Sequence, residues 1–327
     1  MGVSFPTPVV IVSKCLELDA CRYNAQRIRA PLVLALHPHV RLRAICPEVE
    51  IGLGVPRDPI KLVAPGGTTR LAQPSTGRDL TKRMAEFGDR FLDSVQEVDG
   101  FILKSRSPSC GIKDTKRYAD EAATRLAGRG AGMFGEAVIR RFPYAAIEDE
   151  ERLTNHHPRH HFLTKLFTRA AFRVLCAHAT MARLVTFHTA NELLLMAYHR
   201  TELRHLGRVL ANAGGKALHE LLAAYEEGLG RALAQPARRA SHVNVLLHAL
   251  GFFAARLTAH EKALFLDHLD QYRENRLPLD ELLTVARAWI TRFQQPYLAA
   301  QTYFEPYPSA LALSETPSAK SPTSSRR

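Results

Sequence analysis

Three cysteines in the first half of the chain each follow a short apolar run of the kind that forms a β-strand. The apolar run Pro8–Ser13 precedes Cys15, the run Arg41–Ile45 precedes Cys46, and the run Asp99–Leu103 precedes Cys110. A lone cysteine in such a place is usually a small buried apolar residue. Three of them, each in a turn context of Pro, Gly or Ser, favour metal ligation, because thiolates bind soft metals.

Iron–sulfur clusters are the commonest soft partner of cysteines alone, and a cubane cluster normally takes four thiolates. Three cysteines would leave one iron without a protein ligand, and such an iron can act as a Lewis acid toward an external sulfur. A further cysteine, Cys21, is an alternative fourth ligand that would close the site. A zinc ion with water in its fourth position is another alternative.

Oxygen-bearing side chains accompany two of these cysteines. Glu48 lies two residues after Cys46, and alternate residues of an extended segment point the same way. We therefore expect its carboxylate to face the same pocket and to serve as a general base. Ser107 and Ser109 precede Cys110, and their hydroxyls are expected to bind a substrate or relay a proton.

The elements that must position these residues alternate between strand and helix patterns. The clearest helix pattern is Leu80–Val98, with apolar residues at helical spacing. Alternation of this kind predicts an α/β domain with a mostly parallel, Rossmann-like sheet over residues 1–150. Because ligands bind at the carboxyl ends of parallel strands, the three cysteines are expected to meet there.

Residues 151–305 carry helix patterns only and predict an all-α helical bundle. Its breaks are expected at Gly214-Gly215, at Pro236 and at Pro278. The predicted helices are His161–Ala179, Ala190–Ala213, Leu218–Leu233, Val243–Phe253, Ala259–Arg273 and Leu279–Phe293. Residues 306–327 are rich in Ser, Pro and Thr, and predict a disordered tail.

The helical region also contains side chains that can bind metals. Cys176 lies in an apolar helical run, and we expect it to be buried. A metal site built from His160 and a later histidine is conceivable. Solvated or capping histidines are the favoured interpretation, because no paired carboxylate spacing accompanies them. The histidines concerned are His156, His157, His160, His161, His178, His188 and His199.

The composition of the 327 residues places the chain among ordinary globular proteins, with 46% hydrophobic and 23% charged residues. A net charge of +12 permits attraction to polyanions, but arginines scattered along helices indicate a solvated surface more often than a binding groove. The sequence has neither a signal-peptide pattern nor an apolar stretch of membrane-spanning length. We therefore expect a cytoplasmic protein with no membrane association, whose cysteines are free or ligate a metal.

Residues 6–300 resemble a known protein family, and the resemblance is carried by three cysteine motifs. These motifs are Ser-Lys-Cys15 with Arg22-Tyr23-Asn24, Cys46-Pro-Glu48 with Gly-Leu-Gly-Val-Pro-Arg57, and Ser107-Pro-Ser-Cys110-Gly. They are similar to those of the thiouracil desulfidase family. The residues after about 150 resemble the YbgA-type helical domain, which is often fused to it.

The resemblance implies a [4Fe–4S] cluster held by Cys15, Cys46 and Cys110. It implies non-redox removal of sulfur from a small thiolated heterocycle such as a thiouracil, with the sulfur released as hydrosulfide. By the same likeness, Glu48 would activate the attacking water and Ser107 would assist proton transfer.

Other roles stay open at the level of sequence. The basic helical region is a possible site for nucleic acid, for a redox partner or for a second copy of the chain. A nucleic-acid-associated binding protein with a structural or sensory cluster is therefore the alternative function.

Overall fold

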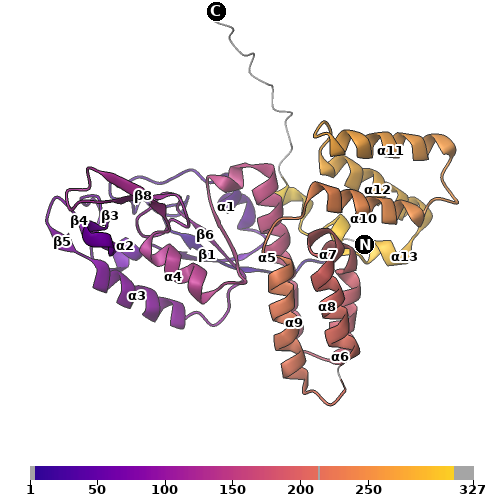
Figure 1. The fold of residues 1–327 in the computed structure, drawn as a ribbon, viewed down its shortest axis with the longest axis horizontal. Helices are drawn as coiled ribbons and strands as arrows, with labels where there is room; N and C mark the ends of the chain where they lie inside the picture. Colours follow the sequence, from indigo (N-terminus) through magenta and orange to yellow (C-terminus); the bar gives the residue numbers. More distant parts are fainter. Residues whose placement is uncertain (1–3, 213, 313–327) are drawn as a thin grey trace, which may run out of the picture.

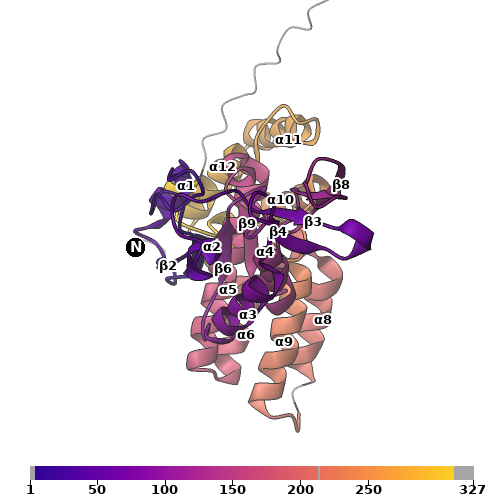
Figure 2. The ribbon, with the colours of Figure 1, turned by 90° about the vertical axis from the view of Figure 1, so that its left-hand side faces the viewer.

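The computed structural model describes residues 4–212 and 214–312. Figure 1 shows two parts, an α/β part on the left and a helical part on the right, with the long helix α5 (His156–Ala177) between them. Figure 2, which looks from the α/β side, shows α8 and α9 extending downward from the helical part while α11 lies at its top. No helix among the described residues is both long and apolar enough to cross a membrane.

A four-stranded, wholly parallel sheet forms the centre of the α/β part, as the strand and helix alternation predicts. Its order is β2-β1-β6-β9. The strands are β1 (Val9–Ser13), β2 (Arg41–Ile45), β6 (Gly100–Leu103) and β9 (Ala146–Asp149). After β2 the chain crosses to the other side of β1, so the topological switch point lies between β1 and β6. Ligands of open parallel sheets bind at the carboxyl ends beside such a point.

Alternate residues of the central strands belong to two separate hydrophobic cores, one on each face of the sheet. Val10 and Val12 of β1 pack with helices α1 (Pro31–Leu36) and α5 on one face. Ile11 packs with α3 (Thr81–Asp93) and α4 (Met133–Arg141) on the other face. The sheet is therefore covered on both sides, which is the usual condition of a parallel sheet.

The α/β part also contains a second sheet, which the sequence patterns do not predict. Its order is β5-β4-β3-β7-β8, and only the β3–β7 pair is parallel. The strands are β3 (Lys61–Val63), β4 (Arg70–Gln73), β5 (Arg78–Asp79), β7 (Thr115–Tyr118) and β8 (Leu126–Gly130). They have two to five residues each and many charged side chains, so no apolar alternation marks them.

The region after residue 150 is helical, as expected. Besides α5 its helices are α6 (Met181–Ala190), α7 (Glu192–Tyr198), α8 (Arg200–Ala211), α9 (Leu218–Ala232), α10 (Arg239–Gly251), α11 (Ala259–Arg273), α12 (Leu279–Phe293) and α13 (Pro296–Ala299). The single helix expected over Ala190–Ala213 is wrong. His199 has extended backbone angles (φ −157°, ψ 89°) and separates α7 from α8.

The prediction of a disordered tail over residues 306–327 is wrong for residues 306–312. Tyr307 and Leu311 are buried in the core that contains α1 and α5. Arg159 of α5 donates two hydrogen bonds to the Leu311 carbonyl oxygen. The large apolar side chains in this stretch therefore pack against both parts of the molecule, and residues 313–327 of the predicted tail lie outside the described residues.

Of two side-chain expectations for the helical region, one is wrong and the other holds only in part. Cys176 is exposed rather than buried. The expectation of solvated or capping histidines holds for the exposed His157 and His178 and for His199, which caps α8. It is wrong for His160 and His161, which are partly buried and whose rings pair with the hydroxyls of Tyr307 and Tyr198 respectively. Burial lowers the pKa of His160 to about 4 and that of His161 to about 3, so both rings are neutral at physiological pH.

Candidate functional site

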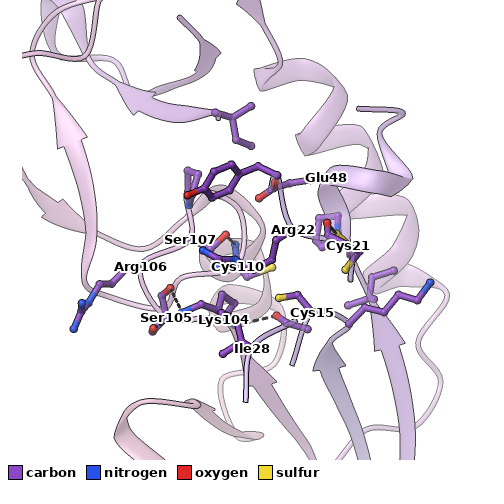
Figure 3. A pocket seen from close by; sticks show the side chains of 18 of the residues that line it. Cys15, Cys21, Arg22, Ile28, Glu48, Lys104, Ser105, Arg106, Ser107 and Cys110 are labelled. Carbon is purple, nitrogen blue, oxygen red and sulfur yellow. Dashed lines mark hydrogen bonds between the residues drawn. The ribbon is translucent and has the colours of Figure 1, made fainter. Parts of the chain in front are cut away.

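A cavity of about 380 Å³ lies at the carboxyl ends of β2, β1 and β6, where the fold predicts a ligand. Cys15, Cys46 and Cys110 line it, and all three are buried. Figure 3 shows their neighbours at this cavity, including Glu48 and Ser107. The structure thus brings together the five residues that the sequence analysis singled out.

The turn after β1 positions Cys15. Ser13 ends the strand, and the Lys14 amide donates to the Ile45 carbonyl at the end of β2 (2.8 Å). The Cys15 carbonyl accepts from the Ile28 amide (2.8 Å), which closes the loop before α1. The turn that carries Cys15 is therefore held by backbone hydrogen bonds to the end of β2 and to the loop before α1.

Cys46 is the residue immediately before the short helix α2 (Pro47–Glu50). Its carbonyl accepts from the Val49 and Glu50 amides, 3.1 Å each. Proline is favourable at the first helical position because its missing N–H would be unpaired there anyway. The expectation that Glu48 follows Cys46 in an extended segment is wrong, since Glu48 lies in this helical turn. Its side chain nevertheless lines the cavity.

The first turn of α4 holds the loop that carries Cys110. The amides of Gly132, Met133 and Gly135 donate to carbonyls of this loop at 2.8–3.0 Å. Helix N-termini leave such amides without partners, and here the loop supplies the acceptors. A Cβ on Gly135 would lie 2.2 Å from the Gly111 oxygen and 2.8 Å from the Cys110 oxygen. Sequence reasoning missed these glycines, because only the fold shows what lies against them.

Two serine hydroxyls contact the Cys110 sulfur. The Ser107 oxygen accepts from the Ser109 and Cys110 amides (3.2 and 3.1 Å), so its proton is left to donate. Ser13 is equally constrained, because its oxygen accepts from the Lys104 amide (2.9 Å). Both hydroxyls hydrogen-bond the Cys110 thiol and oppose the rise in its pKa that burial causes.

The Glu48 carboxylate is held from two sides. One oxygen accepts from Arg57 Nε (3.0 Å) and from a second nitrogen of the same guanidinium. The other oxygen accepts from the Ser109 hydroxyl (2.9 Å). The Arg57 side chain is only 4% exposed and that of Glu48 is 14% exposed. Arg57 belongs to the second cysteine motif, the one that contains Cys46, but only the structure shows that Arg57 is the partner of Glu48.

A second ion pair supports the cavity wall after β6. The Lys104 ammonium donates to Glu150 (2.5 Å) and to the Ser105 hydroxyl (2.7 Å). Glu150 also accepts from the Ser105 amide (2.7 Å) and is itself buried. These contacts tie the loop after β6 to the residues just beyond β9.

Cys21, Cys46 and Cys110 are protonated at neutral pH when no metal is bound. A hydrogen bond that the Cys21 thiol donates to Cys15 is the main cause that raises the pKa of Cys21 to about 11. A hydrogen bond with Cys21 and then burial raise the pKa of Cys46, and burial raises that of Cys110. Metal ligation would therefore displace protons from these thiols.

The chemistry of the donor set fits a cluster of several irons. Among the described residues, no three or more His, Cys, Asp or Glu side chains converge as they would on a single metal ion. The buried thiols of Cys15, Cys46 and Cys110 line one cavity, and thiolates are the ligands that iron–sulfur clusters take.

Residues 10–150, which contain all three cysteine motifs, match the family model described as 2-thiouracil desulfurase. The uncharacterized protein YbbK of Bacillus subtilis (strain 168) is 30% identical over 112 residues, covering 32% of this chain and 73% of that protein. The chain belongs to the 2-thiouracil desulfurase family. Because this family model describes a desulfurase, the alternative function, a nucleic-acid-associated binding protein, is not favoured.

The helical part of this desulfurase-family chain matches a second model, a protein of unknown function (DUF1722), over residues 192–308. The uncharacterized protein YbgA of Escherichia coli (strain K12) is 26% identical over 153 residues, covering 46% of this chain and 90% of that protein. The expected YbgA-type region is thereby confirmed.

Among solved structures, the [4Fe-4S]-dependent thiouracil desulfidase TudS is 28% identical to this desulfurase-family chain. The alignment covers 45% of this chain and 94% of TudS, with a TM-score of 0.35.

Proposed function

We propose that this protein is an iron–sulfur-dependent desulfidase that acts on a small thiolated heterocycle such as a thiouracil. The reaction is hydrolytic, because a thiocarbonyl and water give a carbonyl and hydrosulfide without net oxidation. The observation that carries the proposal is the shared cavity of Cys15, Cys46, Cys110 and Glu48. The description of the matching family supports the type of reaction.

Cys15, Cys46 and Cys110 are the proposed ligands of a [4Fe–4S] cluster, and residues 1–150 are the proposed catalytic domain. When bound, the cluster would supply a soft Lewis acid for the thiocarbonyl sulfur. The hydroxyls of Ser13 and Ser107 contact Cys110 and would stabilise its thiolate. Residues 151–305 form the proposed second domain.

Glu48 is the proposed general base that takes a proton from the attacking water. Its two hydrogen-bond partners, Arg57 and Ser109, hold the carboxylate in one orientation at the cavity wall. Each carboxylate oxygen has two lone pairs, so the oxygen that accepts from Ser109 keeps one for a water. A fixed base removes the need to order that group during the reaction.

Ser107 is the proposed aid to proton transfer. Two backbone amides occupy its oxygen as donors, which leaves the hydroxyl proton directed away from them. In the metal-free protein this proton goes to Cys110. The same hydroxyl lines the cavity and can donate to a substrate atom there.

The first experiment measures iron and acid-labile sulfide in protein purified without oxygen. We expect about four irons per chain, and loss of iron when Cys15, Cys46 or Cys110 is changed to Ala. Cys176→Ala is the matched control, because Cys176 is exposed on α5 and far along the chain from the cavity. Protein that stays free of iron after anaerobic reconstitution would refute the proposal.

Glu48→Gln tests the catalytic step separately from cluster binding. We expect full iron content and a loss of at least about 100-fold in kcat for 2-thiouracil, measured as hydrosulfide release. Glu50→Gln is the control, since Glu50 lies in the same short helix but is exposed. Equal turnover of Glu48→Gln and the unaltered protein would remove Glu48 from the mechanism.

A further inference from the structure

A fourth cysteine shares the cavity with the three proposed ligands. Cys21 lies in the connection between β1 and α1, is 4% exposed, and lines the same cavity wall. Figure 3 shows Cys21 together with Cys15 and Cys110 among the side chains that line this cavity. The remaining cysteine of the chain, Cys176, is exposed on α5.

The Cys21 thiol is in direct contact with two of the proposed ligands. It forms side-chain hydrogen bonds with Cys15 and with Cys46. The Cys46 sulfur also lies 3.8 Å from the Cys21 carbonyl oxygen. The three thiols therefore form one group, and Cys110 completes it from the loop after β6.

The backbone around Cys21 is held in place by the residue that also holds Glu48. Arg57 donates from one guanidinium nitrogen to the Cys21 carbonyl (3.0 Å), and its amide donates to the Tyr23 carbonyl (2.9 Å). These hydrogen bonds hold the backbone on both sides of the Cys21 thiol at the cavity.

We propose that Cys21 supplies a fourth, displaceable thiolate to the cluster when no substrate is bound. This inference rests on the proposed function, because it assumes the cluster on Cys15, Cys46 and Cys110. Four irons call for four ligands, and Cys21 is a buried soft donor that lines the same cavity as the other three and whose carbonyl oxygen contacts the Cys46 sulfur.

Substrate binding would then be a ligand exchange in which the thiocarbonyl sulfur replaces the Cys21 thiolate, with no change in oxidation state. The released Cys21 thiolate takes a proton from solvent. The thiolate thus protects the reactive iron between turnovers and competes with the substrate for it.

Controlled oxidation tests this role without measuring turnover. An iron that lacks a protein ligand is lost when a cubane cluster is oxidised, and a three-iron cluster with a distinctive EPR signal remains. We would treat loaded, substrate-free protein with ferricyanide under argon and measure iron and EPR spectra. The variants are Cys21→Ala and Cys21→Ser, with Cys176→Ala as the control.

We expect the unaltered protein and Cys176→Ala to keep about four irons, while both Cys21 variants fall to about three and show the three-iron signal. We also expect Cys21→Ala to have a lower KM for 2-thiouracil, because the competing ligand is gone. Equal iron loss in all four proteins would overturn the role of Cys21 and leave the proposed function intact.

Two further outcomes are distinguishable. If the unaltered protein never holds iron, the proposed function itself fails. If both Cys21 variants fail to load iron while Cys176→Ala loads normally, Cys21 is a permanent ligand and the displaceable role is refuted.

Discussion

The carboxylate of Glu48 depends on one arginine. Arg57 is almost completely buried and directs three nitrogens at Glu48, Cys21 and Gly54. Removing one partner of a buried ion pair leaves the other charge without compensation, and that loss exceeds the contribution of an exposed pair. Arg57 therefore contributes to stability as well as to the orientation of the proposed base.

Replacing Arg57 with Met tests this dependence. We expect Arg57→Met to lower the free energy of unfolding by about 3–5 kcal/mol, measured by urea denaturation. Arg41→Met is the control, because Arg41 pairs with Glu97 at the surface, where the side chains are 65% and 50% exposed. The control is expected to change stability by less than about 1 kcal/mol. Equal losses in the two variants would contradict the buried-pair interpretation.

At the scale of elements, α4 and the Cys110 loop form one unit. The loop carbonyls pair with amides in the first turn of the helix, and the glycines of that turn allow the close approach. A side chain at Gly135 would meet backbone oxygens, which cannot move aside as a flexible side chain can. The position of one proposed cluster ligand thus depends on a residue 25 positions further along the chain (135 − 110).

Gly135→Ala is expected to destabilise the protein by about 1–3 kcal/mol and to reduce iron loading, because the Cys110 loop must shift. Thermal unfolding and iron content measure the two effects. Gly88→Ala in α3 is the control, since its Cβ would meet its nearest atoms only at 3.9–4.0 Å. Alanine there is expected to be neutral or stabilising. An unshifted Tm and full iron content in Gly135→Ala would refute the close-approach argument.

At the scale of the whole molecule, α5 joins the two parts. Phe162 and Leu166 pack against the parallel sheet, whereas Phe172 and Leu175 pack in the helical core. An ion pair between Arg173 and the buried Asp99 adds a polar link at the start of β6 (2.9 Å). The sheet face that α5 covers would be exposed without it.

Buried histidines make the helical part sensitive to acid. Burial lowers the pKa of His242 to about 3, and His160, His157 and Arg239 lower it further through their charge. The unfolded chain has an ordinary histidine pKa near 6.5, so between these values it binds more protons than the folded protein. Stability is therefore complete above about pH 6.5 and falls as the pH drops below it.

His242→Gln is expected to weaken this pH dependence, although it also lowers stability at neutral pH by removing the hydrogen bond with Tyr303. The measurement is the difference in unfolding free energy between pH 7.5 and pH 5.5. His248→Gln, in the same helix α10, is the matched control because His248 is exposed. If the two variants show the same pH difference, His242 does not contribute to acid sensitivity.

The sequence by itself determined the parallel sheet, the helical region after it and the cysteines at strand ends. Apolar runs and helical spacing are local signals, and the carboxyl-end rule converts them into a shared location for Cys15, Cys46 and Cys110. The sequence did not predict the five-stranded sheet, because its short charged strands gain their stability from strands that are distant in the sequence.

Only the tertiary structure decided which side chains support the site. Arg57 as the partner of Glu48, Gly135 against the Cys110 loop and the thiol contacts of Cys21 all join separate segments of the chain. Such contacts follow from how elements pack, and no local pattern of residue types encodes them. The sequence thus identified the chemical groups, whereas packing set their distances, their burial and their hydrogen-bond partners.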